Sequence, residues 1–450
     1  MMTPQWVKEA IFYHIYPLGL CDAPQRNDFN AVPVARLNAL YSWLDHIQSL
    51  GVNAIYLGPG FESSAHGYDT ADYFHVDRRL GTIDDLRALI HVMKSRGLHV
   101  ILDGVFNHVG RDFWAFRDVL QNGQQSPYCD WFANLTFGQT NAYGDPFSYE
   151  GWAGHYDLVK LNLRNPDVKN HLLEAARYWI ETFDIDGLRL DAADSIDFGF
   201  FRDLRTSCNQ MKSDFWLMGE VVHGDYRQWA NPGMLDATTN YECYKGLYSS
   251  HADCNYFEIA YSLNRQFGEE GLYRDLWLYN FADNHDVDRV ASQLQNPAHL
   301  YTLYGLLFTM PGVPSIYYGS EWGIEGERTS QSDKMLRPAL SIDDLKIPQP
   351  DLPKTLQRFA SIRRNAPALK YGSYRQRYVT HEQFAFERQA PDQTLIIVLN
   401  ASSQKVEVPL ESISGRRLVD LLNPGQSFDV MSGKASIDVD SNWLRILQVS

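Results

Sequence analysis

Three acidic residues follow apolar, β-rich runs of the sequence. Asp191 ends the run GLRLD, Glu220 ends FWLMGE, and Asp286 lies in NHDVDR, a few residues after a third run. Each one alone has an ordinary interpretation, because an acidic residue at a strand end commonly caps the next helix. Their recurrence favours one shared site, since the carboxyl ends of parallel strands meet at one face of a barrel.

Converging carboxylates suit the cleavage of a glycosidic bond, in which one acid stays charged beside the sugar and another protonates the leaving oxygen. Arg189 lies two residues before Asp191 and points to the same face of a strand, so we expect it to keep Asp191 ionised as a nucleophile. Glu220 has no basic neighbour in sequence, and apolar surroundings are expected to raise its pKa and keep it protonated as general acid. Asp286 would add a second negative charge and hold sugar hydroxyls.

The elements that must position these residues alternate along the chain, as is typical of a parallel α/β protein. Strands are predicted at 11–16, 54–57, 100–105, 187–191, 215–220, 234–239, 276–280 and 315–318. Helices are predicted at 37–50, 83–96, 167–183, 200–211, 300–309 and 354–365. Eight strands favour a (β/α)8 TIM barrel over an open sheet. Thr82 and Asp85 form a predicted capping box at the start of one helix.

Two segments break this alternation. Residues 111–161 are rich in Gly, Asn, Gln and aromatic residues without steady periodicity, and are predicted to be a subdomain inserted after the third strand. The final part, 368–450, changes to short strands with turn signals and is predicted to be an antiparallel, β-sandwich-like domain. The barrel is then expected to comprise residues 1–110 and 162–367.

The composition limits the class of partner. The 450 residues carry 40 basic and 55 acidic side chains, a formal charge of -15, which opposes binding to nucleic acid or to an anionic membrane. No apolar run approaches the length of a membrane span, and neither a signal peptide nor a metal-type cysteine spacing is evident. We therefore expect a soluble, cytoplasmic protein whose many aromatic rings, 13% of the residues, suit disc-shaped ligands such as sugars.

Four motifs in this order resemble the signature regions of the α-amylase family of retaining glycoside hydrolases. They are DGVFNH at 103–108, GLRLD at 187–191, GE at 219–220 and NHD at 284–286. The stretches IFYHIYP at 11–17, HGYD at 66–69 and MPGVPSIYYGSE at 310–321 extend the resemblance over most of the chain. The resemblance implies a barrel, an inserted subdomain and a C-terminal β domain, in agreement with the pattern of elements.

By the same resemblance, Asp191 matches the catalytic nucleophile, Glu220 the acid/base, and Asp286 the third carboxylate, which distorts and stabilises the bound sugar. The substrate-binding residues implied are Tyr68, His108, Arg189, His285 and Arg289. Asp103 matches a structural aspartate and is not counted as catalytic. No cofactor is required, although Asn107 stands where many α-amylases bind calcium, so a calcium ion remains an open alternative.

Within the family, LVKLN at 158–162 and YEGWAG at 149–154 resemble the neopullulanase, cyclomaltodextrinase and maltogenic amylase group. That group usually has Trp where this chain has Val222, which implies a wider acceptor side. Ala192 after the nucleophile goes with α-1,4 bonds in the family. Members usually carry a further β domain before the barrel, whereas this sequence enters the barrel pattern by residue 11, so the oligomeric state is left open.

The resemblance implies a retaining hydrolase of α-1,4 bonds in maltodextrins or cyclic maltooligosaccharides, with an α-glucan oligosaccharide as the binding partner. Three alternatives stay open. The first is an α-glucanotransferase, since a sugar hydroxyl can take the covalent intermediate as readily as water. The second is an α-1,6-acting member of the family. The third is a non-catalytic carbohydrate-binding protein, because a fold does not fix a function.

Overall fold

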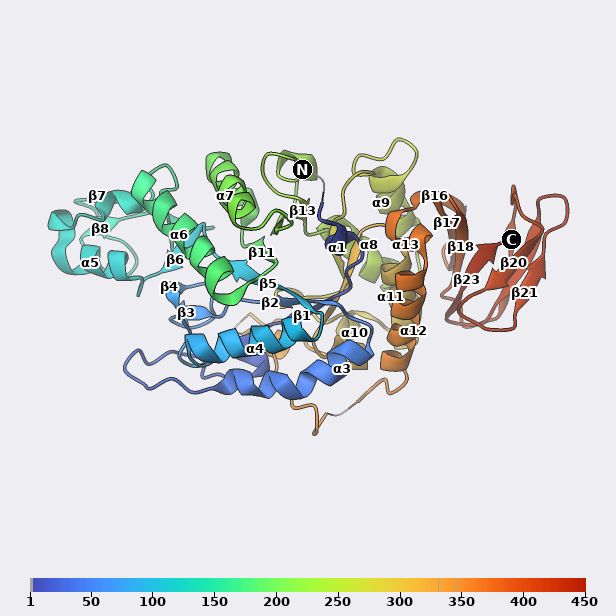
Figure 1. Cartoon of the computed structure of the whole chain (residues 1–450), viewed down its shortest axis with the longest axis horizontal. Coiled ribbons are helices and arrows are strands. Elements are labelled where there is room, and N and C mark those ends of the chain that lie inside the picture. Colours follow the sequence, from blue (N-terminus) through green and yellow to red (C-terminus); the bar gives the residue numbers. More distant parts are fainter. Residues whose placement is uncertain (1–2, 331, 346) are drawn as a thin grey trace.

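The computed structural model describes residues 3–330, 332–345 and 347–450 (Figure 1). Eight parallel strands form one sheet in the order β13-β12-β11-β5-β2-β1-β15-β14. They are β1 (Phe12–Ile15), β2 (Ala54–Leu57), β5 (His99–Gly104), β11 (Gly187–Leu190), β12 (Trp216–Gly219), β13 (Ala237–Thr238), β14 (Tyr279–Phe281) and β15 (Val313–Tyr317). A parallel bridge between Thr239 and Tyr279 joins the two outer strands and closes the sheet. The predicted TIM barrel is confirmed.

The strand boundaries differ slightly from those expected from sequence. β14 starts three residues later than predicted, because Leu276 still belongs to a turn in which its amide donates to the carbonyl of Tyr273 at 2.9 Å. β15 starts two residues earlier and includes Pro314. The weakest predicted strand, 234–239, is reduced to the two residues of β13.

Alternation along the strands separates two apolar layers. Phe12, Tyr56 and Trp216 belong to one buried cluster, whereas their strand neighbours belong to the larger cluster that includes the helices. In β11, Leu188 and Leu190 pack with the helix-side cluster. Because successive side chains point to opposite faces of a strand, Arg189 is directed to the interior of the barrel.

Helices cover the outside of the barrel. The longer ones are α3 (Leu44–Ser49), α4 (Ile83–Ser95), α6 (Pro166–Phe183), α7 (Phe198–Met211), α8 (Tyr241–Ala252), α9 (Phe257–Phe267), α11 (His299–Thr309) and α12 (Leu352–Asn365). The short ones are α1 (Gln5–Lys8), α2 (Pro17–Leu20), α10 (Val290–Gln293) and α13 (Pro367–Tyr371). The capping box of Thr82 and Asp85 is present at the start of α4. The predicted helix 37–50 is a 3-10 segment, Arg36–Trp43, followed by α3.

Further elements leave the barrel at the ends of β2 and β5. After β2, the hairpin β3 (Phe61–Ser63) and β4 (Thr70–Val76) precedes α4. After β5 come β6 (His108–Gly110), α5 (Trp114–Asn122), β7 (Thr136–Phe137), β8 (Phe147–Ser148), β9 (Gly151–Trp152) and β10 (His155–Lys160). The second group contains the antiparallel sheet β6-β10-β9 and lies at the opposite end of the molecule from the C-terminal strands (Figure 1). The boundaries 111 and 161 of an inserted subdomain stay a prediction.

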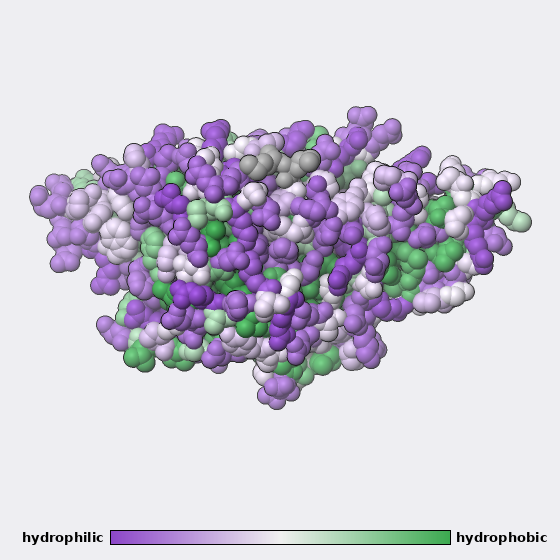
Figure 2. Space-filling model, in the orientation of Figure 1, coloured by the Kyte–Doolittle hydropathy of each residue, from purple (hydrophilic) through white to green (hydrophobic). Residues whose placement is uncertain are grey.

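The C-terminal part is antiparallel, as predicted. Its strands are β16 (Ser373–Val379), β17 (Gln383–Ala390), β18 (Gln393–Asn400), β19 (Val406–Leu410), β20 (Arg417–Asp420), β21 (Ser427–Asp429), β22 (Ala435–Val439) and β23 (Trp443–Val449). Six form one sheet and β19 pairs with β22 in another. The buried guanidinium of Arg388 in β17 donates to the carbonyl of Thr309 at the end of α11, which ties this sheet to the barrel. Figure 2 shows a mostly hydrophilic face, with hydrophobic residues in small separate areas.

Candidate active site

A cavity of about 510 Å³ opens at the carboxyl ends of the barrel strands. The barrel contributes Asp191, Glu220 and Asp286 to its wall, from the chain that follows β11, β12 and β14. Its other lining residues are His66, Tyr68, His108, Trp152, His155, Leu158, Ala192, Asp194, Val222, Tyr241, Val287, Arg328, Asp333 and Arg337. The three carboxylates singled out in the sequence therefore meet at one cavity.

Arg189 is the common partner of three carboxylates. It is only 3% exposed, and its Nη1 lies 2.9 Å from Asp191 Oδ1 and 2.9 Å from Asp103 Oδ1. Its Nη2 lies 2.9 Å from Glu220 Oε2. Glu220 therefore does not lie in the apolar surroundings expected from the sequence, because Arg189 reaches it from the adjacent strand β11.

The backbone after β11 also holds Glu220. The amide of Ala192 donates to Glu220 Oε2 at 3.1 Å, and the hydroxyl of Tyr241 donates to Oε1 at 3.3 Å. Ala192 adopts φ 46° and ψ 43°, the left-handed conformation that non-glycine residues rarely take. Strained backbone of this kind clusters at functional sites. Here it accompanies an amide contact that fixes one oxygen of Glu220.

The expected effect of Arg189 on Asp191 also needs correction. Burial raises the pKa of Asp191 well above its ordinary value; Arg189 opposes this shift, while the neighbouring charge of Glu220 adds to it. Arg189 therefore does not by itself hold Asp191 ionised, as the sequence suggested. The charge of Asp103 adds to this rise in the pKa of Asp191 as well, so burial and the surrounding carboxylates together outweigh the contact with Arg189.

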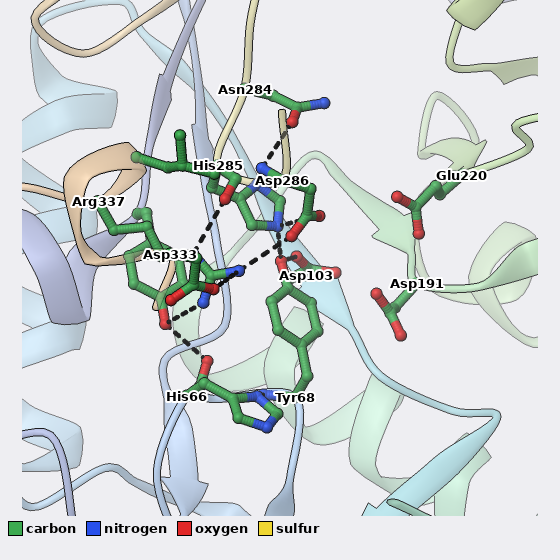
Figure 3. A network of polar contacts seen from close by, with 12 residues as sticks. His66, Tyr68, Asp103, Asp191, Glu220, Asn284, His285, Asp286, Asp333 and Arg337 are labelled. Carbon is green, nitrogen blue, oxygen red and sulfur yellow. Dashed lines mark hydrogen bonds and ion pairs between the residues drawn. The ribbon is translucent and has the colours of Figure 1, made fainter. Parts of the chain in front are cut away.

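Asp286 differs from this pair. It faces Asp191 and Glu220 across the site in Figure 3. His285 Nε2 lies 2.8 Å from Asp286 Oδ2, and Arg337 Nη2 lies 2.9 Å from Oδ1. Burial opposes ionisation, but His285 and Arg337 hold the pKa of Asp286 well below its ordinary value. Asp286 is therefore a fixed negative charge.

Tyr68 and His285 pack face to face, with ring centres 5.4 Å apart and planes inclined by 9°. The Tyr68 hydroxyl donates to Asp103 Oδ2 at 3.1 Å and also contacts His285 Nε2. Tyr68 lines the cavity, whereas His285 is 2% exposed and its ring also lies nearly parallel to that of Tyr16. His285 thus contacts two residues of the cavity wall, Tyr68 and Asp286, and is not itself among the lining residues; its role as a sugar ligand stays a prediction.

His108 points its Nε2 at the nucleophile candidate, 3.6 Å from Asp191 Oδ2, and this nitrogen has no hydrogen-bond partner. The amide Nδ2 of Asn107 lies 3.1 Å from His108 Nδ1. Burial lowers the pKa of His108 to about 3, so the ring is neutral. Because Nδ2 can only donate, Nδ1 accepts and the proton of the ring sits on Nε2, toward the cavity.

Arg289 does not reach the cavity. Its guanidinium is fully buried, donates to the carbonyls of Tyr318 and Leu336, and lies over the ring of Tyr317. The sugar-binding role expected for Arg289 is therefore not supported. Arg337, which sequence reasoning missed, occupies the wall instead; it lies twenty residues beyond β15, in a stretch without strand or helix periodicity, so no sequence signal marked it.

The β9–β10 hairpin supplies an aromatic wall. Trp152 lines the cavity, with its ring 5.5 Å from that of His108, and His155 stacks beside it at 6.1 Å. The turn between them has left-handed Ala153 and Gly154, which lets two-residue hairpins close tightly. The motif YEGWAG therefore brings a ring to the site.

A calcium ion is not favoured at Asn107. Ca²⁺ takes six to eight oxygen ligands, usually with several carboxylates. Across the described residues no group of three or more His, Cys, Asp or Glu side chains is spaced to hold a metal, and the amide of Asn107 is directed at His108. The residues present suit a hydrogen-bonding role for Asn107.

Comparison with known proteins decides the family. Residues 15–348 match the family described as "Alpha amylase, catalytic domain", and residues 374–441 match "Maltogenic Amylase, C-terminal domain". The chain belongs to the α-amylase family of glycoside hydrolases. Among the described residues of this family member, no helix is long and apolar enough to cross a membrane.

Named relatives place the chain within one part of the α-amylase family. It is 34% identical to a cyclomaltodextrinase of Bacillus sp over 433 residues, which cover 92% of this chain and 76% of the relative. It is 30% identical to an intracellular maltogenic amylase of Bacillus subtilis, over 92% of this chain and 72% of the relative. The structure of the cyclic α-maltosyl-(1→6)-maltose hydrolase from Arthrobacter globiformis matches with a TM-score of 0.83 and 27% identity over the full length of both chains.

Proposed function

We propose that the protein hydrolyses α-1,4-glucosidic bonds of maltodextrins or cyclic maltooligosaccharides, with retention of configuration at the anomeric carbon. The observation that carries the proposal is the pair Asp191 and Glu220, both held at 2.9 Å by Arg189 in the cavity wall. A retaining double displacement requires two neighbouring carboxyl groups, one that attacks the sugar as a carboxylate and one that protonates the leaving oxygen.

In the first step, Asp191 attacks the anomeric carbon while Glu220 gives its proton to the glycosidic oxygen. The bond between the anomeric carbon and the glycosidic oxygen breaks, and the leaving sugar departs with a hydroxyl group. In the second step, Glu220 removes a proton from water, whose oxygen displaces Asp191 from the same carbon. The product leaves with its original configuration, and both carboxylates return to their starting protonation.

Several neighbours suit this reaction. The fixed charge of Asp286 lies across the cavity, where it would stabilise positive charge that develops on the sugar ring. The Nε2 proton of neutral His108 points toward the position of a sugar hydroxyl beside Asp191. Tyr68 and Trp152 present aromatic rings to the cavity for stacking.

The choice of substrate rests on similarity. The relatives are named as enzymes of cyclomaltodextrins and as a maltogenic amylase, and the aligned structure as a hydrolase of a cyclic maltosyl-maltose. Ala192 favours α-1,4 over α-1,6 bonds by family resemblance. We further propose that the protein acts inside the cell, as the name of the Bacillus subtilis relative states for that protein.

The test is a product chromatogram from β-cyclodextrin, maltoheptaose and pullulan, with NMR of the first anomer formed. We expect maltooligosaccharides and retention from the first two. Asp191→Asn and Glu220→Gln should each abolish most turnover, and Asp194→Asn, an acidic control in the same cavity wall, should stay within a few-fold of wild type.

Azide separates the two roles. It should restore turnover of an activated aryl glycoside by Glu220→Ala, because a small anion replaces water and the leaving group needs no acid. It should not rescue Asp191→Ala with retention. An inverted product, or full activity of a verified Asp191→Asn, would refute the mechanism. If no glucan of the panel is hydrolysed, a non-catalytic binding protein is favoured. If transfer products dominate at low acceptor concentration, a glucanotransferase is favoured.

A further inference from the structure

A second hollow lies on the outside of the barrel, between α8 and α9. Its volume is about 580 Å³, within the range of ligand sites, and none of its lining residues lines the active-site cavity. Gly246 forms part of its floor, where an added Cβ would meet Ile259 at 3.0 Å, so the two helices pack closely beneath it. Of the two helices, α9 packs beside the first C-terminal strand, β16 (Figure 1).

Two aromatic rings stand along one side of this hollow. Phe257 and Tyr261 are four residues apart on α9 and therefore lie on the same helix face, about 6 Å apart along the axis. Phe257 is 45% exposed and Tyr261 is 70% exposed. Large exposed rings gathered at a concave surface mark binding sites more often than isolated ones do.

The polar residues of the hollow are balanced in charge. Lys245 pairs with Glu258 at 2.8 Å, and Arg265 pairs with Glu242. Each pair joins α8 to α9, and together they give the hollow no net charge. This balance disfavours an anionic or a cationic ligand, but it offers hydrogen-bond donors and acceptors to a neutral molecule with many hydroxyl groups.

We propose that this hollow is a second binding site for an α-glucan chain, separate from the active site. Glucosyl units stack on Tyr261 and Phe257, and their hydroxyls bond to the paired charges on α8 and α9. The inference rests on the proposed function, because it takes the ligand class from the proposed substrate. Such a site raises the local concentration of a long glucan at the enzyme and does nothing for substrates too short to reach it.

The test is affinity electrophoresis of the full-length protein in gels that contain soluble starch, in a Glu220→Gln background so that the starch is not digested. The parent protein, in which the residues of the hollow are unchanged, should migrate more slowly in these gels than in gels without starch. Tyr261→Ala and Phe257→Ala should each weaken the apparent affinity about three- to ten-fold, the loss of one stacking ring. Tyr261→Phe is the matched control, because it keeps the ring, and should migrate like the parent.

Kinetics give a second readout in the active enzyme. Tyr261→Ala should lower kcat/KM for soluble starch several-fold and leave kcat/KM for maltotriose as it is. Equal retardation of Tyr261→Ala and the parent in starch gels would overturn the proposal. A sedimentation coefficient that falls in Tyr261→Ala would also overturn it, because the hollow would then be a contact between two copies of the chain. Starch binding without hydrolysis of any glucan would instead refute the proposed function and leave this site standing.

Discussion

Arg189 Nη2 lies 2.9 Å from Glu220 Oε2, while its other terminal nitrogen holds Asp191. One planar guanidinium thus contacts both carboxylates at once and fixes their positions relative to each other. A lysine carries a single ammonium group and cannot make these contacts together. We predict that Arg189→Lys lowers kcat/KM by at least about 100-fold.

The same substitution should change the pH dependence. Arg189 lowers the pKa of Asp191, so weakening that contact raises the pKa further, and the nucleophile becomes ionised only at higher pH. The acid limb of kcat/KM should therefore move to higher pH. Arg205→Lys is a matched control, because Arg205 is also buried and paired, with Asp236, away from the cavity. If both variants lose stability but neither moves the acid limb, Arg189 does not control the ionisation of Asp191.

The second prediction concerns Asn107 and His108. His108→Ala should lower kcat more than it raises KM if the Nε2 hydrogen bond strengthens in the transition state. Asn107→Leu keeps the imidazole but frees its tautomer, so it should lower kcat in the same direction and by less. A change in KM alone would mean that His108 binds the substrate and the transition state equally well. A Tm that falls on EDTA treatment in wild type, but not in Asn107→Leu, would restore the calcium interpretation.

Arg189 and Arg289 show which features of the site the sequence could predict and which it could not. Alternation in GLRLD places Arg189 inside the barrel because leucines at 188 and 190 must face the helices. The partners of Arg189 could not be predicted from the sequence, because Asp103 and Glu220 come beside it only through the order of the strands in the sheet. Arg289 follows β14 and was expected at the site, yet it stands at the start of α10 and donates to the carbonyls of Tyr318 and Leu336.

Other elements escaped prediction for local reasons. α8 was missed because its sequence, YECYKGLYSSHA, has weak helical periodicity and buries Ser249, Ser250 and His251. These polar side chains are tolerated because they bond to the backbone or to neighbours; the Nδ1 of His251, for example, lies 2.7 Å from the carbonyl of Leu247. Satisfied burial of this kind depends on tertiary contacts, which a single sequence does not display.

His251 gives a third prediction, on stability. Burial lowers its pKa to about 3 in the folded protein, against about 6.5 when unfolded. Below pH 6.5 the unfolded chain binds a proton that the folded chain excludes, so stability falls as pH decreases toward 3. The loss between pH 6 and pH 4 is about 2 kcal/mol from this group.

The measurement is Tm at pH 6 and at pH 4 for wild type and His251→Gln. Glutamine keeps a donor near the Leu247 carbonyl but does not titrate, so the fall in Tm should be smaller in the variant. Carboxylates titrate alike in both proteins and cancel in the comparison. Identical falls in Tm would show that His251 is not a source of acid lability.

The last prediction concerns Val222, which lines the active-site cavity and is 37% exposed. The resemblance to the neopullulanase group implies that Trp is usual here, on the side of the leaving sugar, and stacking on an aromatic ring adds about 0.5–1.5 kcal/mol beyond area. With Val, acceptor binding is weak and water should outcompete sugar as the second nucleophile. Val222→Trp should raise the ratio of transfer to hydrolysis several-fold at fixed maltotriose, and Val222→Leu, which adds bulk without a ring, should not. If Trp152 already occupies that face of the sugar, the new ring clashes, and an unchanged or lower ratio in a folded, active variant would reject the argument.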